Sequence, residues 1–201
     1  MPPGLFVIVG TQRFGTTLLC KILSAHTHMF VQNETWLPGV LKSDNLAPAL
    51  LEPALRSFLS KQSASSTGIA DYLWLGLKDP LLSYYPDHLR AFLEFGKVIN
   101  IVRDPRGVVS SYIDNAWGLG TNVFTGALRW RGEVGEQLAL GERSPRRVLT
   151  LKYEDLIADM EGELRKICAF LELPFDDSML QYDKQKGPIR ATTEQERIQA
   201  A

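Results

Sequence analysis

A buried strand, a tight glycine turn and the start of a helix follow one another within residues 5–19, and this succession constrains the fold most. Residues 5–9 are all apolar, which predicts the strand. Gly10 and Gly15 have the spacing of a loop that cradles a phosphate with its backbone N–H groups. The segment therefore predicts an α/β fold with an anion site at the first helix, against the alternative of an ordinary strand-to-helix turn.

The residue after Gly15 indicates which kind of phosphate this loop binds. Thr16 stands where a nucleoside triphosphatase carries the lysine that neutralises the β- and γ-phosphates. The hydroxyls of Thr16 and Thr17 and the positive end of the helix can still hold a phosphate, and Arg13 supplies a cation at a different position. We therefore expect a nucleotide whose 5′ end is not an ordinary triphosphate.

Length and charge limit the classes of protein to which this chain can belong. Its 201 residues suffice for one well-buried domain and are too few for two of ordinary size, so a single domain over residues 1–201 is expected. A formal net charge of −1 argues against a general nucleic-acid binder and gives no support for binding to an anionic membrane. Cationic groups that bind an anion must therefore be gathered locally by the fold.

The cysteines and the apolar runs indicate the cellular compartment of the protein. Cys20 and Cys168 lie in apolar helical patterns, which predicts two buried, reduced thiols. No apolar run reaches the roughly 20 residues of a membrane span, and the N-terminus lacks the basic region of a signal peptide. We expect a cytoplasmic protein, or a luminal one if a membrane anchor was removed from a longer parent.

Apolar runs alternate with helical patterns along the rest of the chain. Strands are expected over residues 5–9, 29–31, 72–77, 98–102 and 147–151, and helices over 17–25, 46–60, 86–95, 124–140 and 157–171, with another after Pro105. The serine-rich residues 63–68 are expected to form a mobile loop. Strands separated by helices predict a parallel sheet covered on both faces, with ligands beyond the carboxyl ends of the strands.

A second polar cluster follows the strand predicted over residues 98–102. Arg103 comes at the end of that strand, and Ser111 lies eight residues further on, about two helical turns into the next element. An arginine fork and a hydroxyl that converge there would hold a second phosphate. The alternative is a surface Arg–Asp pair with a serine that faces solvent.

With these motifs the chain resembles the sulfotransferases that use 3′-phosphoadenosine-5′-phosphosulfate (PAPS). Residues 10–19 resemble the family's 5′-phosphosulfate loop, and Arg103 with Ser111 resembles its 3′-phosphate site. Residues 152–156, followed by a helix and the Phe-Leu-Glu-Leu-Pro run at 170–174, resemble its next landmark. The resemblance is closest to the protein-tyrosine sulfotransferases and their bacterial relatives, whose loop carries an arginine.

The resemblance implies a P-loop NTPase-like, three-layer α/β/α fold with a central parallel sheet. It implies transfer of a sulfuryl group from PAPS to a hydroxyl of a small molecule, a carbohydrate or a peptide tyrosine, with release of adenosine 3′,5′-bisphosphate (PAP). No metal, nucleic acid or membrane partner is expected for this chain, and a homodimer is left open.

The resemblance also assigns roles to residues. Glu34 matches the general base, and Lys78 and Arg13 match cations that stabilise the transition state. Cosubstrate contacts are expected from Gln12, Arg13, Phe14, Gly15, Thr16, Thr17, Arg103, Ser111, Tyr153 and Thr192. His26 matches a helix-ending histidine of the relatives and is interpreted as structural.

Two departures from the family pattern and two other functions have to be weighed. Phe14 replaces the usual serine, and the sequence ends soon after residue 193, so the member is minimal or lacks segments. A small-molecule kinase is disfavoured by Thr16, and a catalytically inactive nucleotide-binding relative is the other alternative.

Residues 35–70 and 113–125 are expected to build the acceptor pocket, with Trp36, Trp117 and Phe124 either lining it or in the core.

Overall fold

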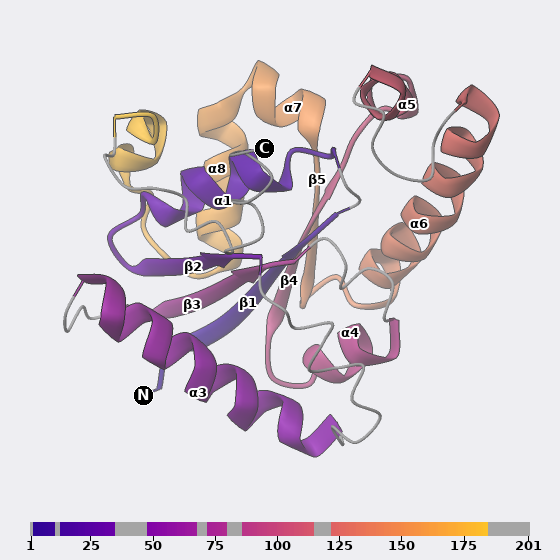
Figure 1. The fold of residues 1–201 in the computed structure, drawn as a ribbon. Coiled ribbons are helices and arrows are strands. Elements are labelled where there is room, and N and C mark those ends of the chain that lie inside the picture. The colour runs from indigo at the N-terminus through magenta and orange to yellow at the C-terminus, as the bar shows by residue number, and fades with distance from the viewer. Residues whose placement is uncertain are drawn as a thin grey trace, which may run out of the picture.

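The computed structural model describes residues 2–10, 13–34, 48–67, 72–79, 86–114 and 122–184, which form a sheet between two layers of helices (Figure 1). The strands are β1 (Gly4–Val9), β2 (Met29–Asn33), β3 (Trp74–Lys78), β4 (Lys97–Val102) and β5 (Val148–Lys152). They pair in parallel in the order β2-β3-β1-β4-β5. The predicted α/β fold with a central parallel sheet is confirmed.

Helices cover both faces of this sheet (Figure 1). One layer contains α1 (Thr16–Ser24), α7 (Tyr153–Ala158) and α8 (Met160–Phe170), followed by the short 3₁₀ helix η2 (Asp177–Gln181). The other layer contains α3 (Pro48–Thr67) and α4 (Pro86–Phe92), with α6 (Val123–Arg143) beside β5. Helix α5 (Pro105–Asp114) follows β4 and packs on α6. Among these described helices, none is both long and apolar enough to cross a membrane.

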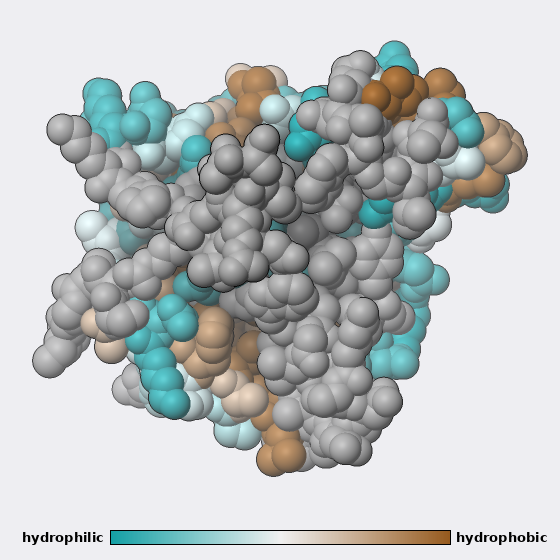
Figure 2. Space-filling model, viewed as in Figure 1, coloured by the Kyte–Doolittle hydropathy of each residue, from teal (hydrophilic) through white to brown (hydrophobic). Residues whose placement is uncertain are grey.

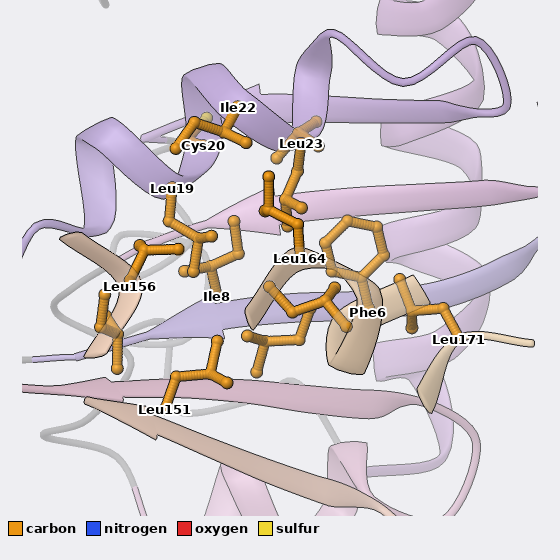
Figure 3. Close-up of a cluster of buried hydrophobic side chains, with 14 of the residues drawn as sticks. Phe6, Ile8, Leu19, Cys20, Ile22, Leu23, Leu151, Leu156, Leu164 and Leu171 are labelled. Carbon is orange, nitrogen blue, oxygen red and sulfur yellow. The ribbon is translucent and has the colours of Figure 1, made fainter. Parts of the chain in front are cut away.

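The central strand β1 is buried on both faces, because its side chains alternate between the two layers. Phe6 and Ile8 point into the cluster formed with Leu19 of α1 and Leu164 of α8, as Figure 3 shows. Leu5, Val7 and Val9 belong to the opposite cluster, which α3 and α4 cover. This double burial explains why residues 5–9 are apolar without alternation.

The path of the chain gives the sheet a switch point between β1 and β4. From β1 the chain crosses through α1 to β2 on one side, whereas from β4 it crosses through α5 and α6 to β5 on the other side. In open α/β sheets the crevice at such a point, beyond the carboxyl ends of the strands, is where ligands bind. The phosphate-type loop after β1 and Arg103 after β4 lie at this switch point.

Two expected segments differ from the structure. Residues 63–67, predicted as part of a mobile loop, continue α3, whose Leu51, Leu55 and Leu59 are buried at a spacing of four against the sheet. This burial stabilises the helix despite Pro53 and the serines. The single helix predicted over 157–171 is instead two helices, α7 and α8, because the Asp159 side chain accepts a hydrogen bond from the N–H of Gly162 and caps α8.

Both cysteines are free and buried, as the sequence predicts. Burial raises the pKa of the Cys20 thiol and of the Cys168 thiol to about 11. At neutral pH both thiols are therefore protonated and serve as small apolar side chains of the core.

Lys97 connects β3, β4 and the end of α8 at the amino-terminal edge of the sheet, which is opposite the switch point. The ammonium of Lys97 lies 5.3 Å from the ring centre of Trp74 and 5.1 Å from that of Phe170. It donates to the backbone O of Phe170 at 2.6 Å and to Glu172 Oε1 at 2.9 Å. The Trp74 indole donates to the backbone O of Leu171 at 2.9 Å, so β3, β4 and the end of α8 are joined at this edge.

The turn between α1 and β2 is tied to the start of η2. Asp176 Oδ2 accepts hydrogen bonds from the backbone N and the hydroxyl of Thr27, both at 2.9 Å, and Asp176 Oδ1 accepts from Ser178 N at 3.0 Å. Nearby, His26 accepts at Nδ1 from the N–H of His28, so its Nε2 carries the proton and donates to the backbone O of Pro174 at 3.0 Å. These bonds fit a structural role for His26.

Asp176→Ala tests the contribution of this tie. Burial raises the pKa of the Asp176 carboxyl, but hydrogen bonds from Ser178 and Thr27 outweigh burial and hold it well below its usual range. The substitution should lower the free energy of unfolding by about 1–2 kcal/mol at neutral pH. Because the folded-state pKa is depressed, the carboxylate stabilises the protein fully above the unfolded pKa of about 4, and this contribution is lost as the pH falls.

Urea unfolding at several pH values from about 7 to about 3 measures this effect. The difference between wild type and Asp176→Ala should narrow below about pH 4. Asp177→Ala, at the exposed neighbouring position, is the matched control and should change little. A difference that grows towards acid pH would contradict the stabilising role of the Asp176 carboxylate.

Phe14→Ala tests the packing of the loop after β1. The Phe14 side chain is completely buried in the cluster shared by β1, α1 and α8. Its truncation should cost about 3–5 kcal/mol of the free energy of unfolding. Phe124→Ala removes the same ring at a position that is 71% exposed and should cost under about 0.5 kcal/mol. Equal unfolding midpoints for the two variants in urea would refute the structural role of Phe14.

Candidate active site

Two of the described residues in the loop between β1 and α1 have a left-handed backbone. Arg13 has φ 72° and Gly15, the residue before α1, has φ 91°. A side chain at position 15 would also collide with the ring of Tyr153, whose Cδ2 lies 2.4 Å from the place of a Cβ. Glycine is therefore required at position 15 both by the backbone conformation and by the close approach of Tyr153. The loop leads directly into the N-terminus of α1, whose free N–H groups favour an anion.

The side chains of this loop divide between core and surface. Phe14 lies in the core, so it can contact a ligand only through its backbone. Thr16 is buried, whereas Arg13 and Thr17 are exposed at the carboxyl edge of the sheet. Of the loop side chains predicted to contact the cosubstrate, Arg13 and Thr17 are thus accessible, and Gln12 lies outside the described residues.

The two predicted phosphate motifs meet through hydrogen bonds. Arg13 Nε donates to the Ser111 hydroxyl at 2.7 Å, across 98 positions of sequence. Arg103 Nη1 donates to the backbone O of Arg13 at 2.9 Å. The loop after β1 and the Arg103–Ser111 motif after β4 therefore form one connected cluster, which sequence spacing alone does not reveal.

Aromatic residues hold Arg103 in this cluster. The guanidinium carbon lies 4.5 Å from the ring centre of Tyr153, and the indole of Trp130 donates to the backbone O of Arg103 at 2.8 Å. The Nε of Arg103 is buried and has no hydrogen-bond partner among the described residues. A buried guanidinium donor without a partner suits an anionic ligand, since such a group is otherwise costly. Trp130 was missed by sequence analysis, because it falls inside an ordinary helical pattern.

The nearby Arg106 has a different partner. Its side chain donates to both oxygens of Asp104, at 2.7–3.2 Å, and is 90% exposed. Hydrogen bonds from Arg106 lower the pKa of the Asp104 carboxyl to about 2. Arg106 thus forms a surface ion pair next to the cluster without joining it.

A glutamate and a lysine meet on the other side of β1. Lys78 ends β3, is paired in register with Asn33 of β2 and Ile8 of β1, and lies on the face covered by α1. Glu34 follows β2 directly, and its N–H donates to the backbone O of Lys78 at 2.8 Å. Lys78 Nζ donates to Glu34 Oε1 at 2.5 Å. Parallel pairing of β2 and β3 therefore brings together two residues that are 44 positions apart.

Burial differs sharply within this pair. The Lys78 side chain is 1% exposed and that of Glu34 is 30% exposed, so the carboxylate is the more accessible group of the pair. A buried ammonium needs a nearby anion, which Glu34 supplies. Glu34 also has φ 40°, a strained conformation of the kind that clusters at functional sites. Asn33, next to it, has a buried Oδ1 without a hydrogen-bond partner among the described residues.

Other predicted residues are less informative. Thr192, Trp36 and Trp117 lie outside the described residues. Phe124 is exposed and not part of the core, like Ile113 near the end of α5 and Val123 and Leu128 near the start of α6. Figure 2 shows brown, apolar residues at its upper right, where Figure 1 has α5 and α6. Within the described part of the chain, no group of His, Cys, Asp and Glu side chains is arranged to hold a metal ion.

Sequence comparisons relate this chain to known proteins. A family model described as "Sulfotransferase family" matches residues 40–177. Protein-tyrosine sulfotransferase A of Caenorhabditis elegans is 25% identical over an alignment of 205 positions, which covers 90% of this chain and 53% of that protein. The chain spans 70% of a related Caenorhabditis briggsae protein and 28% of a related Aquifex aeolicus (strain VF5) protein.

Solved structures share the fold. The sulfotransferase domain from the curacin biosynthetic pathway matches with a TM-score of 0.68 at 22% identity, over 95% of this chain and 81% of that one. Mouse sulfotransferase SULT7A1, solved in complex with PAP, matches with a TM-score of 0.57 at 16% identity, over 92% and 63% of the two chains. With this fold and a family match over more than half of its length, the chain belongs to the sulfotransferase family.

Proposed function

We propose that this sulfotransferase moves a sulfuryl group from PAPS to the hydroxyl of an acceptor and releases PAP. The observation that carries the proposal is the Glu34–Lys78 pair, a reachable carboxylate joined to a buried ammonium at the carboxyl edge of the sheet. Lys78 ends β3, which pairs with β1, and Glu34 follows β2, the next strand of the sheet. A base, a cation and an anion-binding loop are therefore available in one region of the molecule.

The residues around the switch point fit the two anionic ends of PAPS. The backbone N–H groups that begin α1 suit the 5′-phosphosulfate, together with Arg13 and Thr17. The unpartnered Nε of Arg103 and the neighbouring Ser111 suit the 3′-phosphate. A solved relative of the same fold is a complex with PAP, which supports this cosubstrate.

The chemistry that follows is an in-line transfer. The acceptor oxygen bonds to sulfur while the bond from sulfur to the bridging phosphosulfate oxygen breaks, through a transition state as loose as that of phosphoryl transfer. Glu34 takes the proton of the acceptor hydroxyl. Lys78 and Arg13 stabilise the negative charge on the leaving bridging oxygen and the sulfuryl oxygens, where one well-placed donor contributes roughly 3–4 kcal/mol.

The acceptor class, the metal requirement, the oligomeric state and the cellular location are expectations from the sequence. Relatives named protein-tyrosine sulfotransferases support a hydroxyl acceptor, with a tyrosyl peptide alongside small molecules and carbohydrates. A metal-free reaction and a cytoplasmic location stay predictions from the sequence, and a homodimer stays open. A screen with labelled PAPS and a panel of tyrosyl peptides, phenols and sugars, read by mass spectrometry, identifies the acceptor.

The same acceptor panel, incubated in parallel with PAPS and with ATP and Mg²⁺, separates the rival functions. Phosphoryl transfer that depends on ATP and Mg²⁺, without sulfuryl transfer, would identify a kinase. Binding of PAPS without transfer to any acceptor would identify an inactive relative. Sulfuryl transfer in the presence of a chelator would support the proposed reaction without a metal.

Glu34→Gln tests the general base. The amide keeps the size of the side chain but cannot accept the acceptor's proton, so kcat should fall by about 10²–10⁴-fold while the affinity for PAP changes little. Steady-state rates with the acceptor from the screen and calorimetric titration with PAP measure the two effects.

Glu172→Gln is the matched control. Glu172 is also a glutamate with positive φ, 59°, hydrogen-bonded to a lysine, but it lies at the amino-terminal edge of the sheet. This variant should retain the wild-type kcat. Wild-type turnover in Glu34→Gln would remove Glu34 from the mechanism, and an equal loss in both variants would point to a general effect of losing a surface charge.

A further inference from the structure

We propose that Arg103 also positions the phosphate-binding loop, so that recognition of the 3′-phosphate is coupled to the geometry at the sulfuryl end. The inference rests on the proposed function, because it concerns the same cosubstrate. It assigns to Arg103 a second task, carried out through the backbone of Arg13. In this task Arg103 is a positioning residue for the loop.

The contact falls on the strained part of the loop. Arg103 Nη1 donates to the backbone O of Arg13, the non-glycine residue with φ 72°. A left-handed conformation at a non-glycine residue persists only where the surrounding structure holds it. The Arg13 side chain is at the same time fixed by its hydrogen bond to Ser111, so both the backbone and the side chain of this residue depend on the segment after β4.

A second route connects Arg103 to the same loop. Its guanidinium stacks over Tyr153, and that ring lies so close to Gly15 that no Cβ would fit between them. Arg103, Tyr153 and Gly15 therefore form a stack at the start of α1. Arg13 and Gly15, which are left-handed residues in the described part of the loop, are each linked to this one guanidinium, Arg13 directly and Gly15 through the ring.

The position of Arg103 is set from outside the loop. Trp130 of α6 donates to its backbone O, and the residue follows the last position of β4. Its Nε, buried and unpartnered among the described residues, can bind an anion while Nη1 stays on the loop. A 3′-phosphate bound there fixes the guanidinium more firmly and through it the carbonyl of Arg13, the residue proposed to act at the sulfuryl group.

Ligands with and without a 3′-phosphate separate the two tasks. If Arg103 only bound the 3′-phosphate, its removal would leave the affinity for adenosine 5′-phosphate unchanged and would raise KM for PAPS without changing kcat. If it also holds the loop, its removal weakens the binding of adenosine 5′-phosphate and lowers kcat at saturating PAPS. The second pattern is the one expected.

Calorimetric titrations of PAP and adenosine 5′-phosphate into wild type, Arg103→Ala and Arg103→Lys provide the test. Arg103→Ala should lower the affinity for PAP by about 10–100-fold and the affinity for adenosine 5′-phosphate by about 5-fold. The 5-fold loss corresponds to one ordinary hydrogen bond. Arg103→Lys keeps a charge for the phosphate but loses the planar fork. It should therefore keep more of the PAP affinity than Arg103→Ala while kcat still falls.

Arg106→Ala is the matched control, because it removes an arginine charge three positions away that is paired with Asp104 outside the cluster. It should leave both affinities within about 2-fold of wild type. Trp130→Phe keeps an aromatic ring but loses the donor to the Arg103 carbonyl. It is therefore a second test of the positioning role if the Arg103 variants unfold. It should weaken the binding of adenosine 5′-phosphate in the same direction.

The outcomes distinguish this inference from the proposed function. Unchanged affinity for adenosine 5′-phosphate and unchanged kcat in folded Arg103→Lys, or in folded Trp130→Phe, overturn the positioning role and leave the PAPS reaction intact. A comparable loss of affinity for adenosine 5′-phosphate in Arg106→Ala would assign the effect to the general electrostatic field, and it would also overturn the positioning role. A wild-type protein that binds no PAP contradicts the proposed function itself.

Discussion

Burial of β1 on both faces is the constraint on which the rest of this structure depends. Phe6 and Ile8 pack under α1 and α8, and Leu5, Val7 and Val9 pack over α3 and α4, so the strand cannot shift without disturbing both layers. Neighbouring strands are held to it in register, with Ile8 opposite Lys78. The carboxyl end of β1 is therefore a fixed point, around which the loop, the Glu34–Lys78 pair and Arg103 are arranged.

Much of this architecture can be predicted from the sequence, because the strong signals are local. Apolar runs mark the five strands, and Gly10 and Gly15 mark the turn before α1. Predictions fail where distant contacts outweigh local preference. The serines at the end of α3 indicate a loop, yet the leucines of that helix are held against the sheet, and the break between α7 and α8 depends on a single cap by Asp159.

The candidate site also has features that the sequence predicts and features that only the fold reveals. Arg103 and Ser111 are identified by their spacing and by resemblance, and Glu34 and Lys78 by resemblance alone. The structure joins these residues in two clusters. The hydrogen bond between Arg13 and Ser111 joins two different crossovers, and the donation from Trp130 to Arg103 joins residues 27 positions apart within one crossover. Neither bond is visible in the sequence. Spacing along one element can be read from a sequence, whereas convergence at a sheet edge requires the fold.

The burial of Phe14 has a consequence for how the protein responds to heat. In many enzymes a surface loop at the active site melts before the body of the domain, so activity is lost below the temperature of unfolding. Here the loop carries a fully buried ring into the same cluster that holds β1, α1 and α8 together. Thermal inactivation and global melting should therefore occur as one event.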